Sequence, residues 1–176
     1  MLPTKDTQKK IAGGFTLLEA IVSIFLLTVG IVGISSLISQ TISSSSKESS
    51  RLTVAYLAQE GVELVRNIRD NNWLEQRNNP LVNWDDDLPE GDWEADYNSL
   101  SLAAYAGRYL KQDNSFYNYT SGSDTKFKRK ITIFDKTDLS SPLDGIPDMF
   151  KVTVTIEWQE KGKTNNFSVQ DYLYNW

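Results

Sequence analysis

The chain has 176 residues, with 18 Lys and Arg, 23 Asp and Glu, and a formal net charge of −5. It contains neither His nor Cys, which excludes disulfides, thiolate or imidazole metal sites, and Ser-His or Cys-His nucleophiles. The acidic balance disfavours direct nucleic-acid binding, because phosphates would be repelled. The hydrophobic fraction of 40% is enough for a folded core.

An apolar stretch near the N-terminus is the first predicted element. Residues 20–46 carry no charge, and Glu19 is the one charged residue between Phe15 and Ile38. A helix needs roughly 20 apolar residues to cross a bilayer core. The stretch also exceeds the roughly 7–15 apolar residues of a secretory signal peptide. We therefore predict a membrane-spanning helix over 15–42.

Basic residues before this stretch predict its orientation. These basic residues are Lys5, Lys9 and Lys10, and Asp6 is the one acidic residue among them. Positive residues stay on the cytoplasmic side of a membrane. The N-terminus should therefore be cytoplasmic, the chain should cross the inner membrane once, and the globular part should be extracytoplasmic.

A glycine pair and a carboxylate set this segment apart from a plain anchor. Gly13 and Gly14 separate the basic residues from the apolar run, and a backbone without side chains can lie close to a protease. A charge such as that of Glu19 costs about 2.5–3.5 kcal/mol at mid-bilayer. A cut between Gly14 and Phe15 would free an amino group that could pair with Glu19 of the same chain or of a neighbour. A carboxylate that snorkels to the interface is the third interpretation.

The segment Lys-Ile-Ala-Gly-Gly-Phe-Thr-Leu-Leu-Glu (10–19) resembles the leader and cleavage motif of type IV prepilins and type II secretion pseudopilins. The resemblance implies that a prepilin peptidase removes residues 1–14 by cutting after Gly14 and then methylates the amino group of Phe15. It also implies that Glu19 pairs with the N-terminus of an adjacent subunit during assembly.

The same resemblance implies a function. Residues 55–67 are similar to the corresponding region of minor pilins and smaller pseudopilins. The chain would be stored in membrane lipid, and would then join other pilin or pseudopilin subunits through its helix, in a pilus or pseudopilus at the cell surface. Priming of assembly, adhesion and DNA uptake remain open as roles. The alternative is an anchored receptor or adhesin that keeps its leader and never polymerises. An enzyme is not expected, because the paired acids lack diagnostic spacing for hydrolysis.

Residues 43–70 read as the amphipathic second half of the same helix. Apolar residues recur there at helical spacing, and polar residues occupy much of the other side. The apolar positions are Val54, Leu57, Ala58, Gly61, Leu64, Val65 and Ile68. We predict one helix from Phe15 to about Arg69, with a stop at Asn71-Asn72.

Residues 71–176 should form the extracytoplasmic domain. The first part, 71–103, is acidic and contains Trp73, Trp84 and Trp93. It reads as a loop pinned by tryptophans that pack on a sheet, or as a binding site with aromatic platforms. A short helix is expected over 100–110.

The remaining sequence predicts antiparallel strands. Residues 150–158 alternate strictly between apolar and polar, Lys161-Gly162-Lys163 supplies a hairpin turn, and 166–174 returns with a bulge near Tyr172. A further strand is expected over 127–134. Its basic cluster reads as an ordinary outer strand face or as a local binding patch, and consists of Lys126, Lys128, Arg129 and Lys130. The apolar sheet face needs a cover, and the helix stripe supplies it, which gives an α+β, pilin-like fold.

The connection 135–149 is acidic. Asp144-Gly-Ile-Pro-Asp148 resembles the end of calcium-binding Asp-rich repeats, although Ser140 and Pro142 stand where further acids would be expected. Calcium held by Asp138, Asp144 and Asp148 is one interpretation. A rigid Pro-Gly turn with solvated acids is the other.

Overall fold

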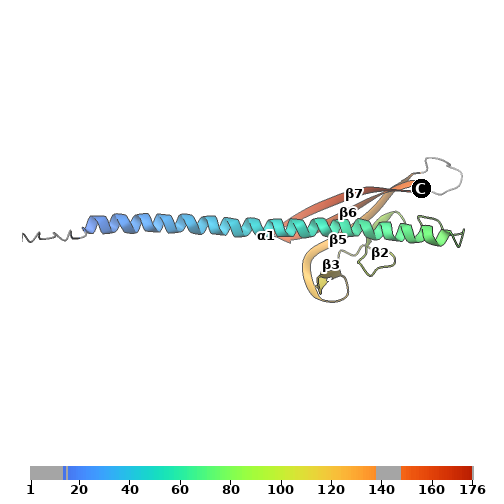
Figure 1. Cartoon of the computed structure of the whole chain (residues 1–176), viewed down its shortest axis with the longest axis horizontal. Coiled ribbons are helices and arrows are strands. Elements are labelled where there is room, and N and C mark those ends of the chain that lie inside the picture. The colour runs from blue at the N-terminus through green and yellow to red at the C-terminus, as the bar shows by residue number, and fades with distance from the viewer. Residues whose placement is uncertain (1–13, 15, 138–147, 176) are drawn as a thin grey trace, which may run out of the picture. The chain divides into compact units, whose positions relative to one another are not determined.

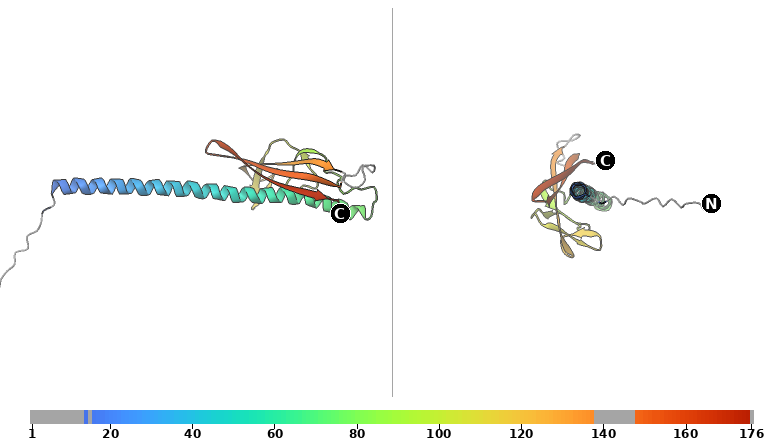
Figure 2. Two further views of the ribbon diagram at one scale, coloured as in Figure 1. Left: turned by 90° about the horizontal axis from the view of Figure 1, so that it is seen from above. Right: turned by 90° about the vertical axis from the view of Figure 1, so that its left-hand side faces the viewer.

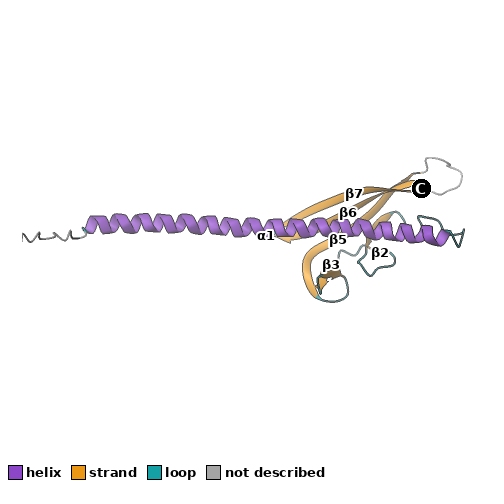
Figure 3. Cartoon of the chain, viewed as in Figure 1, coloured by secondary structure: helices purple, strands orange, loops and turns teal. Residues whose placement is uncertain are grey.

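The structure is a computed structural model that describes residue 14 and residues 16–137 and 148–175. Within these residues it has one long helix and seven strands (Figures 1 and 3), and this α+β architecture confirms the expected fold class. The chain divides into two units, Met1–Glu48 and Ser49–Trp176. The amphipathic part of the helix therefore belongs to the same unit as the sheet.

Helix α1 runs from Leu17 to Gln76. No proline occurs between Pro3 and Pro80, so no residue in this range lacks the backbone donor that a helix needs. The predicted stop at Asn71-Asn72 is wrong. The side chain of Asn72 is buried, and its Nδ2 donates to the carbonyl oxygens of Trp84 at 3.2 Å and Asp86 at 2.6 Å. These bonds to the following loop satisfy the buried amide of Asn72, and the helix continues past it to Gln76.

All strands pair antiparallel in one sheet. Their bounds are β1 Gly91–Glu94, β2 Ala103–Ala104, β3 Tyr109–Asp113, β4 Phe116–Asn118, β5 Ser123–Thr137, β6 Met149–Glu160 and β7 Lys163–Tyr174. β5 pairs with β6 along one edge and with both β1 and β3 along the other, while β7 pairs with β6 alone. The sheet therefore has a long outer strand at one side and short strands at the other.

The second half of α1 covers the sheet, and β6 and β7 lie along it (Figure 2). The expected stripe is buried, except that Leu64 is only partly buried and Val62 joins it. The helix approaches β6 closely at Gly61, where an added Cβ would lie 2.7 Å from Cγ1 of Val154. The alternation predicted for β6 is confirmed, and its buried residues are Phe150, Val152, Val154, Ile156 and Trp158.

Two local predictions are wrong. Residues 100–110 contain β2 and the start of β3 instead of a helix, and Gly107 lies between them at a φ of 70°. The pairing of β6 with β7 continues from Met149↔Tyr174 to Glu160↔Lys163 without the expected bulge. Phe167 is also more exposed than expected, at 39%. The hairpin turn at Lys161-Gly162 is confirmed, with φ of 51° and 74°.

Candidate functional site

The first half of α1 exposes its apolar side chains on every face. The most apolar 18-residue window has a mean hydropathy of 2.5, and none of it is buried within the structure. Exposed positions include Leu17, Leu18, Ile21, Ile24, Phe25, Leu26, Leu27, Ile31, Val32, Ile34, Leu37, Ile38 and Ile42. By length and composition this one helix is able to span a membrane. The helix therefore agrees with the predicted membrane anchor in length and apolar composition.

Thr16 and Glu19 form the start of α1. The backbone N–H of Glu19 donates to Oγ1 of Thr16 at 3.2 Å, and the backbone N–H of Ala20 donates to the Thr16 carbonyl oxygen at 3.1 Å. Thr16 is thus the N-cap, and Glu19 occupies the third helical position, where a capping box places Glu or Gln. A carboxylate in the first turn also interacts favourably with the helix dipole. The sequence signal was the pattern Thr-x-x-Glu, which the sequence analysis missed.

The predicted cleavage point lies just before this cap. Gly14 is exposed, and an added Cβ there would meet no atom within 4 Å. Phe15, whose amino group is predicted to become the N-terminus, lies outside the described residues. The exposed, side-chain-free Gly14 is compatible with access by a peptidase.

In the second unit, the predicted basic cluster is divided between the two faces of β5. Arg129 is fully buried beneath α1, where its guanidinium donates to the carbonyl oxygens of Leu57 and Ala95 and pairs with Glu60 at 3.1 Å. The three lysines engage other partners: Lys126 bonds Ser50, Lys128 lies over Tyr109, and Lys130 pairs with Asp92. Arg129 is therefore not part of an outer strand face, and Lys126 bonds the helix. Lys128 and Lys130 contact residues of the neighbouring strands, as on an ordinary outer face.

A smaller polar network lies beside Arg129. Glu94 is buried, pairs with Arg108, and its Oε2 has no hydrogen-bond partner among the described residues. The Arg108 guanidinium also lies 4.6 Å from the ring centroid of Tyr119. Burial of the Tyr119 hydroxyl raises its pKa to about 12. This network fixes β1 against the segment after β4.

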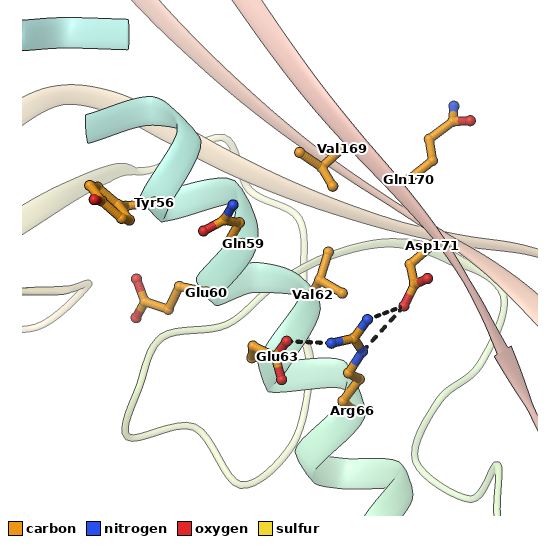
Figure 4. Close-up of a pocket in the computed structure, with 9 residues that line it drawn as sticks. All are labelled: Tyr56, Gln59, Glu60, Val62, Glu63, Arg66, Val169, Gln170 and Asp171. Atoms are coloured by element: carbon orange, nitrogen blue, oxygen red, sulfur yellow. Dashed lines mark hydrogen bonds and ion pairs between the residues drawn. The ribbon is translucent and has the colours of Figure 1, made fainter. Parts of the chain in front are cut away.

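A groove of about 530 Å³ runs between α1 and β7 (Figure 4). At its centre Arg66 bonds Oδ2 of Asp171 through Nε at 3.2 Å and Nη2 at 2.8 Å, and Nη1 contacts Glu63. The hydrogen bonds that Arg66 donates to Asp171 raise the pKa of Arg66 above its ordinary value. Asp171 therefore occupies the helix-facing side of β7 with its charge compensated, which explains a strand pattern that the sequence analysis took for a bulge.

The three tryptophans of residues 71–103 pack onto the core, but this range is not all loop, because Trp73 lies in α1 and Trp93 in β1. Trp84 is 1% exposed and stacks on Phe150 with ring centroids 5.1 Å apart. Trp73 and Trp93 are partly buried against the same core. These contacts confirm the interpretation in which the tryptophans pack on the sheet and favour it over a binding site with aromatic platforms.

Two of the three expected calcium ligands, Asp138 and Asp144, lie outside the described residues. Asp148 precedes β6 and is half-buried, and its carbonyl oxygen accepts the N–H of Asn175 at 2.8 Å. No group of three or more acidic side chains placed to hold a metal occurs within 16–137 and 148–175. Calcium binding by this loop remains a prediction.

Comparison with protein-family models, curated proteins and solved structures finds no match to this chain.

Proposed function

We propose that the chain is a structural subunit of the minor pilin or pseudopilin kind. A prepilin peptidase would remove residues 1–14, methylate Phe15 and leave a subunit anchored in the inner membrane by its apolar helix. That helix would then carry the subunit into a type IV pilus or a type II secretion pseudopilus, where Glu19 pairs with an amino terminus.

One observation carries the proposal: the first half of α1 is apolar on all faces and exposed, and its acid lies in the first turn directly after the predicted cut. Removing a large apolar side chain from water is worth about 1.5–3 kcal/mol. For the whole segment the total is on the order of tens of kcal/mol, so lipid or a bundle of neighbouring helices has to surround it.

The carboxylate of Glu19 distinguishes these two environments. In lipid its charge costs about 2.5–3.5 kcal/mol at mid-bilayer. In a bundle of chains that begin at residue 15, each carboxylate meets an ammonium group, which removes most of that cost. The pairing would therefore favour transfer from lipid into the filament and would fix the axial register of neighbouring subunits.

The first experiment measures the intact mass of the protein extracted from membranes and from sheared fibres. The proposal predicts a chain that begins at Phe15 and carries one added methyl group. Gly14→Leu, a bulky replacement at the exposed residue before the cut, should block cleavage. A wild-type chain that still begins at Met1 in fibres would falsify the proposal.

The second experiment separates the charge of Glu19 from its place in the capping box. Gln is accepted at this position of a capping box but cannot form an ion pair, whereas Ala loses both. If the ion pair matters, Glu19→Gln and Glu19→Ala should be cleaved and inserted normally, and both should be depleted from sheared fibres. If Gln is incorporated normally and Ala is not, capping is the role of Glu19.

A non-polymerising anchored receptor or adhesin is the second candidate. The exposed apolar helix is equally compatible with it, because a single-pass anchor has the same composition. This candidate predicts an uncut leader and no dependence of surface display on Glu19. The intact-mass measurement therefore decides between the two.

A further inference from the structure

Strand β7 presents a long open edge. It has 12 residues and, among the residues that the structure describes, pairs with β6 alone, whereas the other outer strands, β2 and β4, have 2 and 3 residues. Natural sheets usually protect such an edge with a proline, a bulge or charges along its length. β7 contains neither Pro nor bulge, and its two charged residues are Lys163, at its start, and Asp171, three residues before its end. Such an edge is a template for another strand.

The β6–β7 hairpin determines which backbone groups face this edge. Its two-residue turn makes Glu160 and Lys163 a hydrogen-bonded pair. Because such pairs alternate along an antiparallel ladder, the odd-numbered residues of β7 bond β6. The even-numbered residues from Thr164 to Tyr174 direct their N–H and C=O groups outward. The side chains of Lys163, Phe167 and Asp171 share the helix-facing side.

We propose that β7 of a second copy of this chain pairs antiparallel with this edge, centred on Phe167. β7 carries one positive and one negative residue, and a symmetric pairing that places Lys163 opposite the partner's Asp171 is centred on Phe167. The same register makes Thr164 face Gln170 and Asn166 face Ser168, so polar groups meet polar groups. These outward-facing pairs would exchange about eight backbone hydrogen bonds.

The side chains suit this register. Phe167, which is 39% exposed, would meet its own counterpart at a non-hydrogen-bonded position, where cross-strand side chains lie closest. Both bonds from Arg66 go to Oδ2 of Asp171, so Arg66 leaves Oδ1 able to accept from a further donor such as the partner's Lys163. The charge pair would therefore occur twice, once at each end of the symmetric interface.

The helix leaves room for a second strand. Gly61 of α1 lies against Val154 of β6, so the helix is centred near β6, one strand away from the edge. At about 4.8 Å between strands, each helix would lie roughly 7 Å from the two-fold axis. Two such helices would be about 14 Å apart, beyond the 8–10 Å of direct helix packing. Tyr56 and Glu63 are exposed on this side of the helix.

This contact is separate from the proposed growth of a filament. β7 runs in the same direction as the helix, since Thr164 and Phe167 lie beside Arg51, and Asn175 lies beside Trp73. Antiparallel strands therefore make the covering helices of the two copies antiparallel. The pairing would join copies of opposite polarity, whereas subunits within one membrane or filament share a polarity.

The test uses the absence of native cysteine. In the full chain, purified in detergent micelles, Phe167→Cys places two thiols on facing residues with Cα atoms about 4.5 Å apart, within reach of a disulfide. Gln170→Cys is the matched control on the same strand, because its own counterpart would lie roughly 20 Å away. We expect oxidation to give a disulfide dimer for Phe167→Cys and for a mixture of Thr164→Cys with Gln170→Cys, but not for Gln170→Cys alone.

Sedimentation at increasing dilution measures the dimer dissociation constant independently, on chains without introduced cysteines. Lys163→Glu turns both charge pairs into repulsions and should weaken the dimer about 10-fold or more. Absence of a Phe167→Cys dimer in a normally folded protein, or equal cross-linking of Gln170→Cys alone, would overturn the proposal. A dimer that Lys163→Glu leaves unchanged would refute the register.

Discussion

Replacing Arg129 with Met tests how the helix is held on the sheet. The Arg129 side chain is 0% exposed, and its guanidinium donates to the carbonyl oxygens of Leu57 at 3.2 Å and Ala95 at 2.6 Å. Met fills a similar volume but leaves both carbonyls without this donor. The Leu57 carbonyl still accepts the helical N–H of Gly61, so it loses one charge-assisted bond, which contributes about 1.5–3 kcal/mol. The Ala95 carbonyl is buried without this donor, and a buried unsatisfied group costs about 1–3 kcal/mol. Glu60 is 32% exposed and can be hydrated, so its loss of a partner adds little.

One effect opposes this cost. Nε of Arg129 has no hydrogen-bond partner among the described residues, and its removal relieves about 1 kcal/mol. The net loss should therefore be about 1.5–5 kcal/mol, a large part of the 5–15 kcal/mol that stabilises a typical domain. Urea denaturation followed by far-UV circular dichroism would measure it on a chain that begins at Ser49, because every residue of the buried core lies after that point.

Lys128→Met is the matched control. Lys128 is adjacent in sequence but lies on the opposite face of β5, with its ammonium 4.6 Å from the ring centroid of Tyr109. An exposed cation–π contact contributes about 0.5–1 kcal/mol, so this variant should lose less than 1 kcal/mol. Equal losses in the two variants, or a gain for Arg129→Met, would refute the assignment of Arg129 to a required buried network.

Three further predictions concern the same unit. Gly61→Ala should destabilise it by about 1 kcal/mol, because overpacking against Val154 costs about 1–3 kcal/mol and the better helix propensity of Ala returns about 1; in a double-mutant cycle Val154→Ala should reduce the loss. The raised pKa of Tyr119 predicts that its contribution to stability is complete below about pH 10 and falls as the pH rises towards 12. Tyr119→Phe should therefore lose less stability than the wild type between pH 9 and 11, and equal losses would contradict this. The calcium interpretation predicts that EDTA lowers the Tm of the wild type and that Asp148→Asn removes the effect, whereas an unchanged Tm would count against it.

Patterns with a regular period were predictable from the sequence. The stripe from Val54 to Ile68 and the alternation from Phe150 to Trp158 each repeat at the period of their element, so the faces that meet were correctly identified. These predictions succeeded because burial of one continuous face dominates the choice of helix or strand. The α+β arrangement followed from the need to cover the apolar side of the sheet.

Positions that depend on one distant partner were not predictable. Arg129 looked like part of a basic outer face, yet its bonds to Leu57 and Ala95 hold it inside. A bulge was expected near Tyr172, yet the strand is regular, and Arg66 compensates the charge of Asp171 on the helix-facing side. Asn72 was expected to end the helix, yet its side chain is buried and bonds the carbonyl oxygens of Trp84 and Asp86. In each case a polar residue is buried or half-buried because a specific partner more than ten residues away satisfies it, and local periodicity carries no information about that partner.

The two halves of α1 differ in what a single chain can provide for them. Between Val54 and Ile68 the apolar residues form one stripe, and one sheet covers it. Between Leu17 and Ile42 they occur on all sides of the helix, and a sheet can cover only one side. Burial of that segment therefore has to come from surroundings that enclose it, either lipid or other helices. If the chain is cut after Gly14 as proposed, the acid of Glu19 makes the two unequal, because in lipid the carboxylate has at most its own amino terminus nearby, whereas a bundle also brings the amino termini of neighbouring chains. Under the proposed function, the position of the cut would therefore decide which surroundings suit the helix.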